Sequence, residues 1–179
     1  WGLLLTGLSY ACEKGPVAVE EPAENYDVSV ETTRDVDILY SDSAQVRVRI
    51  KGPTMLTFSD RREPRQEFPD GVAVDFFGPD QEISSKLTAK YAIRYENDAY
   101  VVIRDSVVWQ SMEGEKLETS QLIWDERRQR VYSDRFVVVT RPEEIIYSQG
   151  FEANQDFSNI RMKAVQGRMK VEDLSEEFQ

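Results

Sequence analysis

Apolar and polar residues alternate along most of the chain, and this alternation predicts β-strands. The stretch 116–140 (KLETSQLIWDERRQRVYSDRFVVVT) shows the pattern most clearly. One run leads to Leu122 and Trp124, a charged turn follows at residues 125–128, and a second run ends in FVVV at 136–139. Apolar residues at every second position, rich in β-branched and aromatic types, are typical of strands. Two such runs joined by a short polar turn predict a β-hairpin.

Three other parts of the chain have a similar arrangement, at residues 86–109, at 150–171, and in the two runs 46–52 and 72–76. Units of roughly 25 to 35 residues are typical of repeat architectures. One unit cannot bury its apolar side alone, so several stacked units predict one extended, curved sheet with a continuous apolar face. We expect no helix between residues 82 and 171. Because proline lacks the N–H that a ladder needs, we expect Pro53 to end the strand that begins at residue 45.

Composition narrows the function. The chain has 179 residues, with 22 Lys and Arg against 33 Asp and Glu and a net charge of −11. A nucleic-acid-binding protein needs a basic surface, so this class is not expected. Histidine is absent and Cys12 is the single cysteine, which removes the commonest general base and the usual zinc ligands. Carboxylates are scattered through turns and outward strand positions. We therefore expect no enzyme, no cofactor and no metal site.

The first residues resemble the end of a bacterial secretory signal. Residues 1–11 (WGLLLTGLSYA) are too short to span a bilayer and are followed at once by Cys12. The sequence SYAC resembles a lipobox, although Leu8 lies four residues before the cysteine instead of three. We expect cleavage before Cys12 and lipidation of that residue, which would anchor the protein to a membrane. A plain secretory signal and an uncleaved hydrophobic anchor are the alternatives.

Three regions follow from these patterns: a truncated signal at 1–12, a flexible tether rich in Glu, Pro, Ala and Val at 13–25, and a folded domain at 26–179. The folded domain also carries short segments whose order and spacing resemble the LptC family, especially its Bacteroidetes-like members. These segments are ILYSDS (38–43), EFPDGV (67–72), LTAKYA (87–92), GEKLET (114–119), YSDRFV (132–137) and GFEANQDF (150–157).

The resemblance implies an all-β fold, an open and twisted β-jellyroll of stacked antiparallel strands like that of OstA, LptA and LptC. It also implies a periplasmic, membrane-anchored protein without enzymatic activity, most readily placed at the inner membrane. Such a protein receives lipopolysaccharide from an inner-membrane ABC transporter with LptB-, LptF- and LptG-like subunits. It passes the lipid to an LptA-like periplasmic protein. Well-known relatives begin with a transmembrane helix, whereas a lipid anchor is expected here.

The alternating strands suggest how lipid would be held. Exposing an acyl chain of a dozen carbons to water costs roughly 10 kcal/mol, at about 0.8 kcal/mol per methylene, so the lipid needs a continuous apolar trough open at both ends. In the alternative, the same side chains only fill a core between two sheet layers. The residues expected to contact lipid are Ile50, Phe76, Trp109, Leu117, Trp124 and Phe136.

The two edges of the sheet are expected to bind partners. An edge strand has unpaired N–H and C=O groups that a strand of another protein can complete. By the family's polarity, Val165, Met169 and Val171 of the last strand would dock the LptA-like protein, and the N-terminal strands would face the transporter. A lipid-anchored structural or adhesion protein built from β-repeats is the competing hypothesis. A filled interior would favour that class, and an open groove would favour transport.

Overall fold

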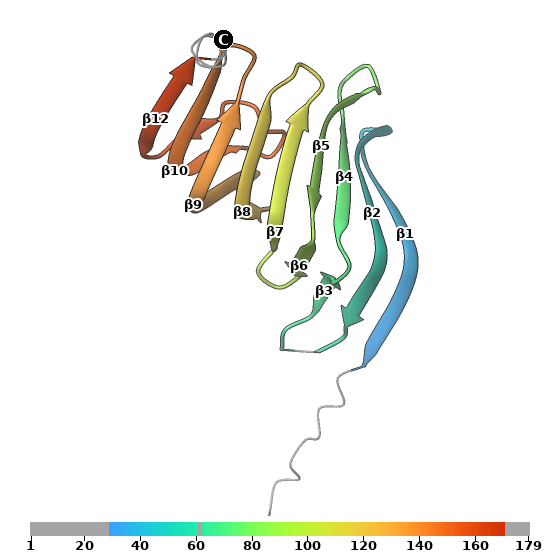
Figure 1. Cartoon of the computed structure of the whole chain (residues 1–179). Helices are drawn as coiled ribbons and strands as arrows, with labels where there is room; N and C mark the ends of the chain where they lie inside the picture. The colour runs from blue at the N-terminus through green and yellow to red at the C-terminus, as the bar shows by residue number, and fades with distance from the viewer. Residues whose placement is uncertain (1–28, 61, 171–179) are drawn as a thin grey trace, which may run out of the picture.

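A computed structural model describes residues 29–60 and 62–170. Within this part of the chain there is no helix, and the strands form one 12-stranded antiparallel sheet (Figure 1). The expected all-β jellyroll of antiparallel strands is therefore confirmed.

The strands follow one another closely along the chain, and most are longer than six residues. They are β1 (Val30–Asp42), β2 (Gln45–Phe58), β3 (Arg65–Phe68), β4 (Val72–Phe77), β5 (Ile83–Ala89), β6 (Tyr91–Tyr95), β7 (Tyr100–Ser111), β8 (Lys116–Asp125), β9 (Arg130–Thr140), β10 (Glu144–Asn154), β11 (Arg161–Met162) and β12 (Val165–Lys170). Strands β8 and β9 form the hairpin predicted for residues 116–140, with Leu117 opposite Val139 and Trp124 opposite Val131.

Three pairs of short strands behave as single long strands with a bend. β2 pairs first with β4 and then with β3, and β7 pairs with β6 and then with β5. In the same way β11 and β12 both pair with β10. The sheet folds over along the line of these bends, and the inner faces of its two portions pack together. We call layer 1 the portion with β4, β5 and β12, and layer 2 the portion with β3, β6 and β11; β1, β2 and β7 to β10 contribute to both.

Residues at the bends adopt backbone conformations that extended strands do not have. Positive φ angles occur at Asp35, Gly71, Asp105, Ser106 and Gly150. At Gly150 φ is +84°, and a Cβ would lie 2.7 Å from the backbone oxygen of Ser133 in β9. Glycine is therefore required at this bend, since a side chain would meet fixed backbone there.

Pro53 does not end β2, contrary to the expectation from sequence. The strand continues to Phe58, and Pro53 falls between Lys51, the last residue paired with β4, and Leu56, the first paired with β3. β2 also pairs with β1 along its other edge. There Gly52 and Thr54 have partners in β1, and Pro53 between them has none. The missing N–H thus coincides with a change of partner, so the proline costs the sheet little.

The inward side chains line up from strand to strand, as the alternation predicted. Ladder pairs connect one row across layer 1, formed by Ile50, Val74, Leu87, Trp109, Leu117, Val139 and Ile146. Facing rows in layer 2 include Phe68, Ala92, Ile103 and Leu122, and Val101, Trp124, Val131 and Ala153. The hydrophobic core lies between these rows.

Candidate functional site

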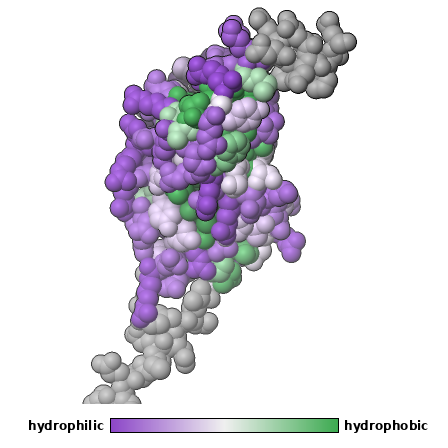
Figure 2. All heavy atoms as spheres, turned by 60° about the vertical axis from the view of Figure 1, so that its left-hand side comes forward, coloured by the Kyte–Doolittle hydropathy of each residue, from purple (hydrophilic) through white to green (hydrophobic). Residues whose placement is uncertain are grey.

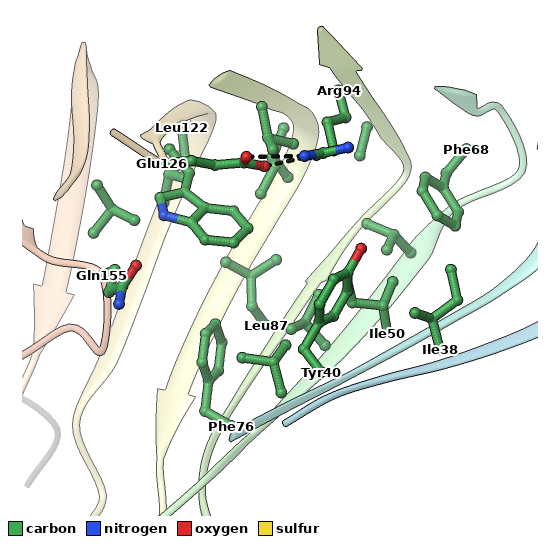
Figure 3. A pocket seen from close by; sticks show the side chains of 18 of the residues that line it. Ile38, Tyr40, Ile50, Phe68, Phe76, Leu87, Arg94, Leu122, Glu126 and Gln155 are labelled. Carbon is green, nitrogen blue, oxygen red and sulfur yellow. Dashed lines mark hydrogen bonds and ion pairs between the residues drawn. The ribbon is translucent and has the colours of Figure 1, made fainter. Parts of the chain in front are cut away.

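A cavity of about 260 Å³ lies between the two layers, toward the side of the sheet that β1 and β2 form. Layer 1 contributes Ile50, Val74 and Phe76 from neighbouring strands, and layer 2 contributes Trp124. Figure 3 shows Ile50 and Phe76 in the cavity wall. Its remaining apolar wall is made of Ile38, Val48, Phe68, Val72, Leu87, Ala92, Val101, Ile103, Leu122, Val131 and Phe157. The walls are thus mostly hydrocarbon.

The size of the cavity limits what it can hold. An apolar cavity of about 150 Å³ engineered in another protein takes up benzene, and sites for drug-sized ligands begin at about 300 Å³. The present cavity lies between these values. It therefore fits a segment of one hydrocarbon chain and is too small for a whole lipid.

An ion pair lies at one edge of the cavity, as Figure 3 shows. Arg94 Nε donates to Glu126 Oε1 at 2.7 Å, and Arg94 Nη2 donates to Glu126 Oε2 at 3.0 Å. The hydrogen bond to Glu126 raises the pKa of Arg94 above its ordinary value, against the opposing effect of burial. Gln66, Gln155 and Tyr40 add neutral polar groups to the lining. The pair is neutral as a unit, so this edge is polar without a strong net charge.

Phe157 forms the part of the cavity wall that lies next to Trp109. Its ring stacks on Trp109 with centroids 4.7 Å apart and meets the edge of Phe76 at 5.8 Å. Beyond it, Leu117, Val139 and Phe151 are 0% exposed, so no space large enough for water touches them. The interior is open beside β1 and β2, and in layer 2 the cavity reaches Val131 of β9, whereas the space around Leu117, Val139 and Phe151 is filled. The expected trough open at both ends is therefore wrong for this structure.

The residues predicted to contact lipid fall into three groups. Ile50, Phe76 and Trp124 line the cavity. Trp109 and Leu117 lie on the same inner face but are buried in the filled part, outside the cavity wall. The sixth, Phe136, is on neither surface.

Phe136 lies on the outer face of β9, which corrects its assignment to the inner face. Its side chain is 46% exposed and stacks on Tyr147 of β10, while Val137 and Val139 point inward. The run FVVV is apolar at both alternating positions, so periodicity could not select the inward side. The aromatic ring of Phe136 favoured this residue as a lipid contact. The register instead places its neighbour Val137 opposite Thr119 on the buried side.

Among the site residues that were not predicted, Phe157, Arg94 and Glu126 matter most for the argument. Phe157 lies in the polar segment NQDFSN at 154–159, where a single large aromatic residue was the available signal. Arg94 is two residues from the buried Ala92 in β6, so alternation alone could have placed it inward. Nothing in the sequence brings Glu126 to Arg94, because they meet only across β7.

The last strand leaves an open edge. β12 pairs with β10, and no other described strand pairs with its far side. Val165 and Met169 are exposed there, and Figure 2 shows an interrupted apolar stripe among hydrophilic residues on the side of the molecule that includes β12. Val171 and Cys12 lie outside the described residues, as do the proposed signal at 1–12 and the tether at 13–25.

Within the described part of the chain, no helix has the length and apolarity needed to cross a membrane. The same residues contain no group of three or more side chains suited to bind a metal ion.

Comparison with known proteins agrees with the fold. The family model for LptC, described as lipopolysaccharide-assembly, LptC-related, matches residues 38–170. None of the curated proteins compared with the chain matches it significantly. The family match begins in β1 and extends to the end of β12, so it spans both layers and the cavity. The chain therefore belongs to the LptC-related family of lipopolysaccharide-assembly proteins.

Proposed function

We propose that this protein holds an acyl chain of lipopolysaccharide in the cavity between its layers and passes the lipid along the export machine. Family membership gives the broader role, which is in lipopolysaccharide transport and involves binding rather than chemical conversion. The proposal goes further in naming a periplasmic carrier at the inner membrane. It accepts lipid from an ABC transporter with LptB-, LptF- and LptG-like subunits and delivers it to an LptA-like protein.

The apolar cavity is the observation that carries the proposal. Each methylene removed from water contributes about 0.8 kcal/mol, so even a few carbons held between Ile50, Phe76 and Trp124 give useful affinity. A neutral polar edge at Arg94 and Glu126 suits a ligand that is apolar in its buried part and polar outside it. The volume encloses only a segment of one chain. The lipid is therefore enclosed only in part, which suits a carrier that must release it.

The edges of the sheet supply the partner contacts in this proposal. β12, with Val165 and Met169, would pair with a strand of the LptA-like protein, with Val171 continuing that edge, and β1 would face the transporter. Lipidation at Cys12 would hold the domain at the inner membrane. Deleting residues 165–179 should abolish capture of the LptA-like partner and leave attachment to the transporter intact. Retained capture by the folded deletion variant would contradict this docking edge.

Photo-crosslinking in cells tests the cavity directly. A photoreactive amino acid placed at position 50, 76 or 124 should capture lipopolysaccharide. The same residue at position 136, on the outer face, should not, and this serves as the matched control. Absence of adducts at all three inner positions, in variants that are expressed and folded, would count against lipid binding in the cavity.

A second candidate is a lipid-anchored structural or adhesion protein that carries no lipid. A protein of this class is expected to have a filled interior throughout, like the one around Leu117 and Phe151. The cavity is not explained by it, because an apolar void without a ligand forgoes packing contacts that the rest of the interior makes. The crosslinking experiment separates the two candidates.

A further inference from the structure

We propose that Phe157 is the specificity-determining stop of the cavity, the residue that sets how much of an acyl chain can enter. This inference rests on the proposed function, in that the ligand is an acyl chain bound between the layers. Phe157 would end the chain's path before it reaches Trp109. The consequence is a preference for the length of hydrocarbon held, which neither the fold nor the family role specifies.

The limit of the cavity coincides with Phe157. In the inward row of layer 1, Leu87 lines the cavity and its ladder neighbour Trp109 does not. The ring of Phe157 covers Trp109 in a nearly parallel stack, with 14° between the planes. Phe157 itself is 4% exposed and lines the cavity from the other side. Phe157 therefore lies between the cavity and Trp109.

The connection between β10 and β11 holds this ring in place. The N–H of Phe157 donates to the backbone oxygen of Asn154 at 2.9 Å, and the N–H of Asn154 donates to that of Ser158 at 3.0 Å. Phe157 has a φ of 62°, which is uncommon for a bulky residue and persists only where the surroundings enforce it. The N–H of Gln155 ties the segment to Gln129 in the β8–β9 turn at 3.0 Å. A polar surface segment is thus shaped to direct one aromatic ring inward.

Removing the ring should lengthen the cavity toward Trp109. The Phe157→Ala variant leaves the space of the ring next to the existing cavity, and fixed strands on both sides prevent it from collapsing completely. Each further methylene that enters the cavity should strengthen binding of the acyl chain about fourfold, because burying one methylene contributes about 0.8 kcal/mol. In the unmodified protein the gain should end once the chain reaches Phe157.

Tryptophan fluorescence can report where the end of the chain lies. The three tryptophans are Trp1, Trp109 and Trp124. Replacing Trp1 and one of the other two by Phe leaves a single reporter, either Trp124 in the cavity wall or Trp109 behind the stop. The probes are fatty acids of increasing length with bromine on the last carbon, because bromine quenches tryptophan on contact. Affinity is measured from the same titrations.

With Phe157 present, the probes should quench Trp124 and leave Trp109 unquenched at every length, and affinity should stop rising with length. With Phe157→Ala, the longer probes should also quench Trp109 and the affinity should continue to rise. Phe157→Leu should keep the stop, and Phe136→Ala, which removes an exposed ring on the outer face, should change nothing. Phe157→Val is a milder variant if the alanine variant does not fold.

Quenching of Trp109 in the unmodified protein would overturn the stop, as would protection of Trp109 in folded Phe157→Ala and Phe157→Val. Either result, with Trp124 still quenched, leaves the proposed function standing. If no probe quenches Trp124 in any variant, acyl chains do not enter the cavity. In that case the proposed function fails, and the stop fails with it.

Discussion

The two ends of the folded sheet have the same construction and different interiors. Beside β1 and β2, the layers enclose a cavity lined by Ile50 and Phe76. Farther along the sheet, Leu117 of β8 and Val139 of β9 are completely buried. Ile50, Leu117 and Val139 belong to one inward row, so the alternation of apolar residues is equally regular at both ends. The difference teaches that alternation creates an apolar face but does not decide whether two such faces meet.

Polar inward residues account for part of this difference. At the open end, Arg94 and Glu126 lie in the cavity wall or at its rim. The filled end has buried apolar side chains instead, such as Ala153 and Phe151. A charged pair needs contact with water or complete hydrogen bonding, so the layers cannot close over it without cost. At the filled end, small hydroxyl side chains interrupt the apolar packing of the described residues, and Ser148 donates a hydrogen bond to the backbone oxygen of Gly150. That end can therefore pack tightly.

Truncating one residue of the shared row at each end should give the largest contrast. Leu117→Ala should lower the free energy of unfolding by about 3–4 kcal/mol, because it leaves a new void in a filled region. Ile50→Ala should cost only about 1–2 kcal/mol, because this side chain already borders open space. Urea unfolding of both variants measures the difference. Equal losses would mean that the two ends are packed alike in solution.

Replacing an alanine by phenylalanine at each end tests the same difference in packing by adding volume instead of removing it. Ala92→Phe should fill the cavity and weaken binding of a fluorescent fatty acid at least tenfold, a change of about 1.4 kcal/mol. Ala153→Phe, in the filled part, should instead destabilise the fold by about 1–3 kcal/mol through overpacking. Binding titrations and thermal unfolding distinguish the two effects. Unchanged binding in folded Ala92→Phe would show that the ligand lies elsewhere.

Loss of the ion pair at the cavity edge should have a smaller effect. Glu126→Gln removes the carboxylate that accepts two hydrogen bonds from Arg94, and both side chains are partly exposed. We expect a loss of about 1 kcal/mol in the free energy of unfolding, between the values for surface and buried pairs. Glu118→Gln, which affects an exposed pair with Lys116, is the control and should change stability by less than about 0.5 kcal/mol. A larger loss in the control would contradict this ranking.

The smallest effect concerns the outer face near the N-terminal edge. A hydrogen bond from Arg49 lowers the pKa of Asp37 below its ordinary value of 3.8. A lowered pKa in the folded state adds stability above the ordinary value, and this stability is lost as the pH falls through the lowered one. The protein should therefore be slightly more stable than its Asp37→Asn variant at neutral pH. The gap should close as the pH falls below 3.8, which urea unfolding across acidic pH can follow. A gap that persists in strong acid would point to another cause.

Much of the fold could be predicted from local pattern, because strands and hairpin turns depend on residues close in sequence. The β8–β9 hairpin and the strand at Val72–Phe77 are examples. The bends were not predicted, since most of them, such as those at Asp35 and Asp105, use residues that are ordinary in turns and strands alike. The prediction that Pro53 ends its strand was wrong because it did not take the neighbouring strands into account. A proline stops a ladder only where a neighbour needs its N–H, and β2 changes partner at that point.

The candidate site was predicted in part. Ile50, Phe76 and Trp124 line the cavity, as alternation and size suggested. Phe136 was misplaced, because four consecutive apolar residues contain no alternation. Phe157 was missed, because its place depends on how a surface connection turns back between the layers.

The sequence by itself determined that this chain forms antiparallel strands with one apolar and one polar face, and that it carries neither histidine nor a cysteine pair. Side-chain alternation along an extended backbone is a local property, so it can be read residue by residue. Only the tertiary structure decided where the sheet bends, which part of the interior stays open, and that Phe157 stacks on Trp109 at the cavity wall. These features depend on which faces meet after the sheet folds over, and residues distant in the chain set the space between them.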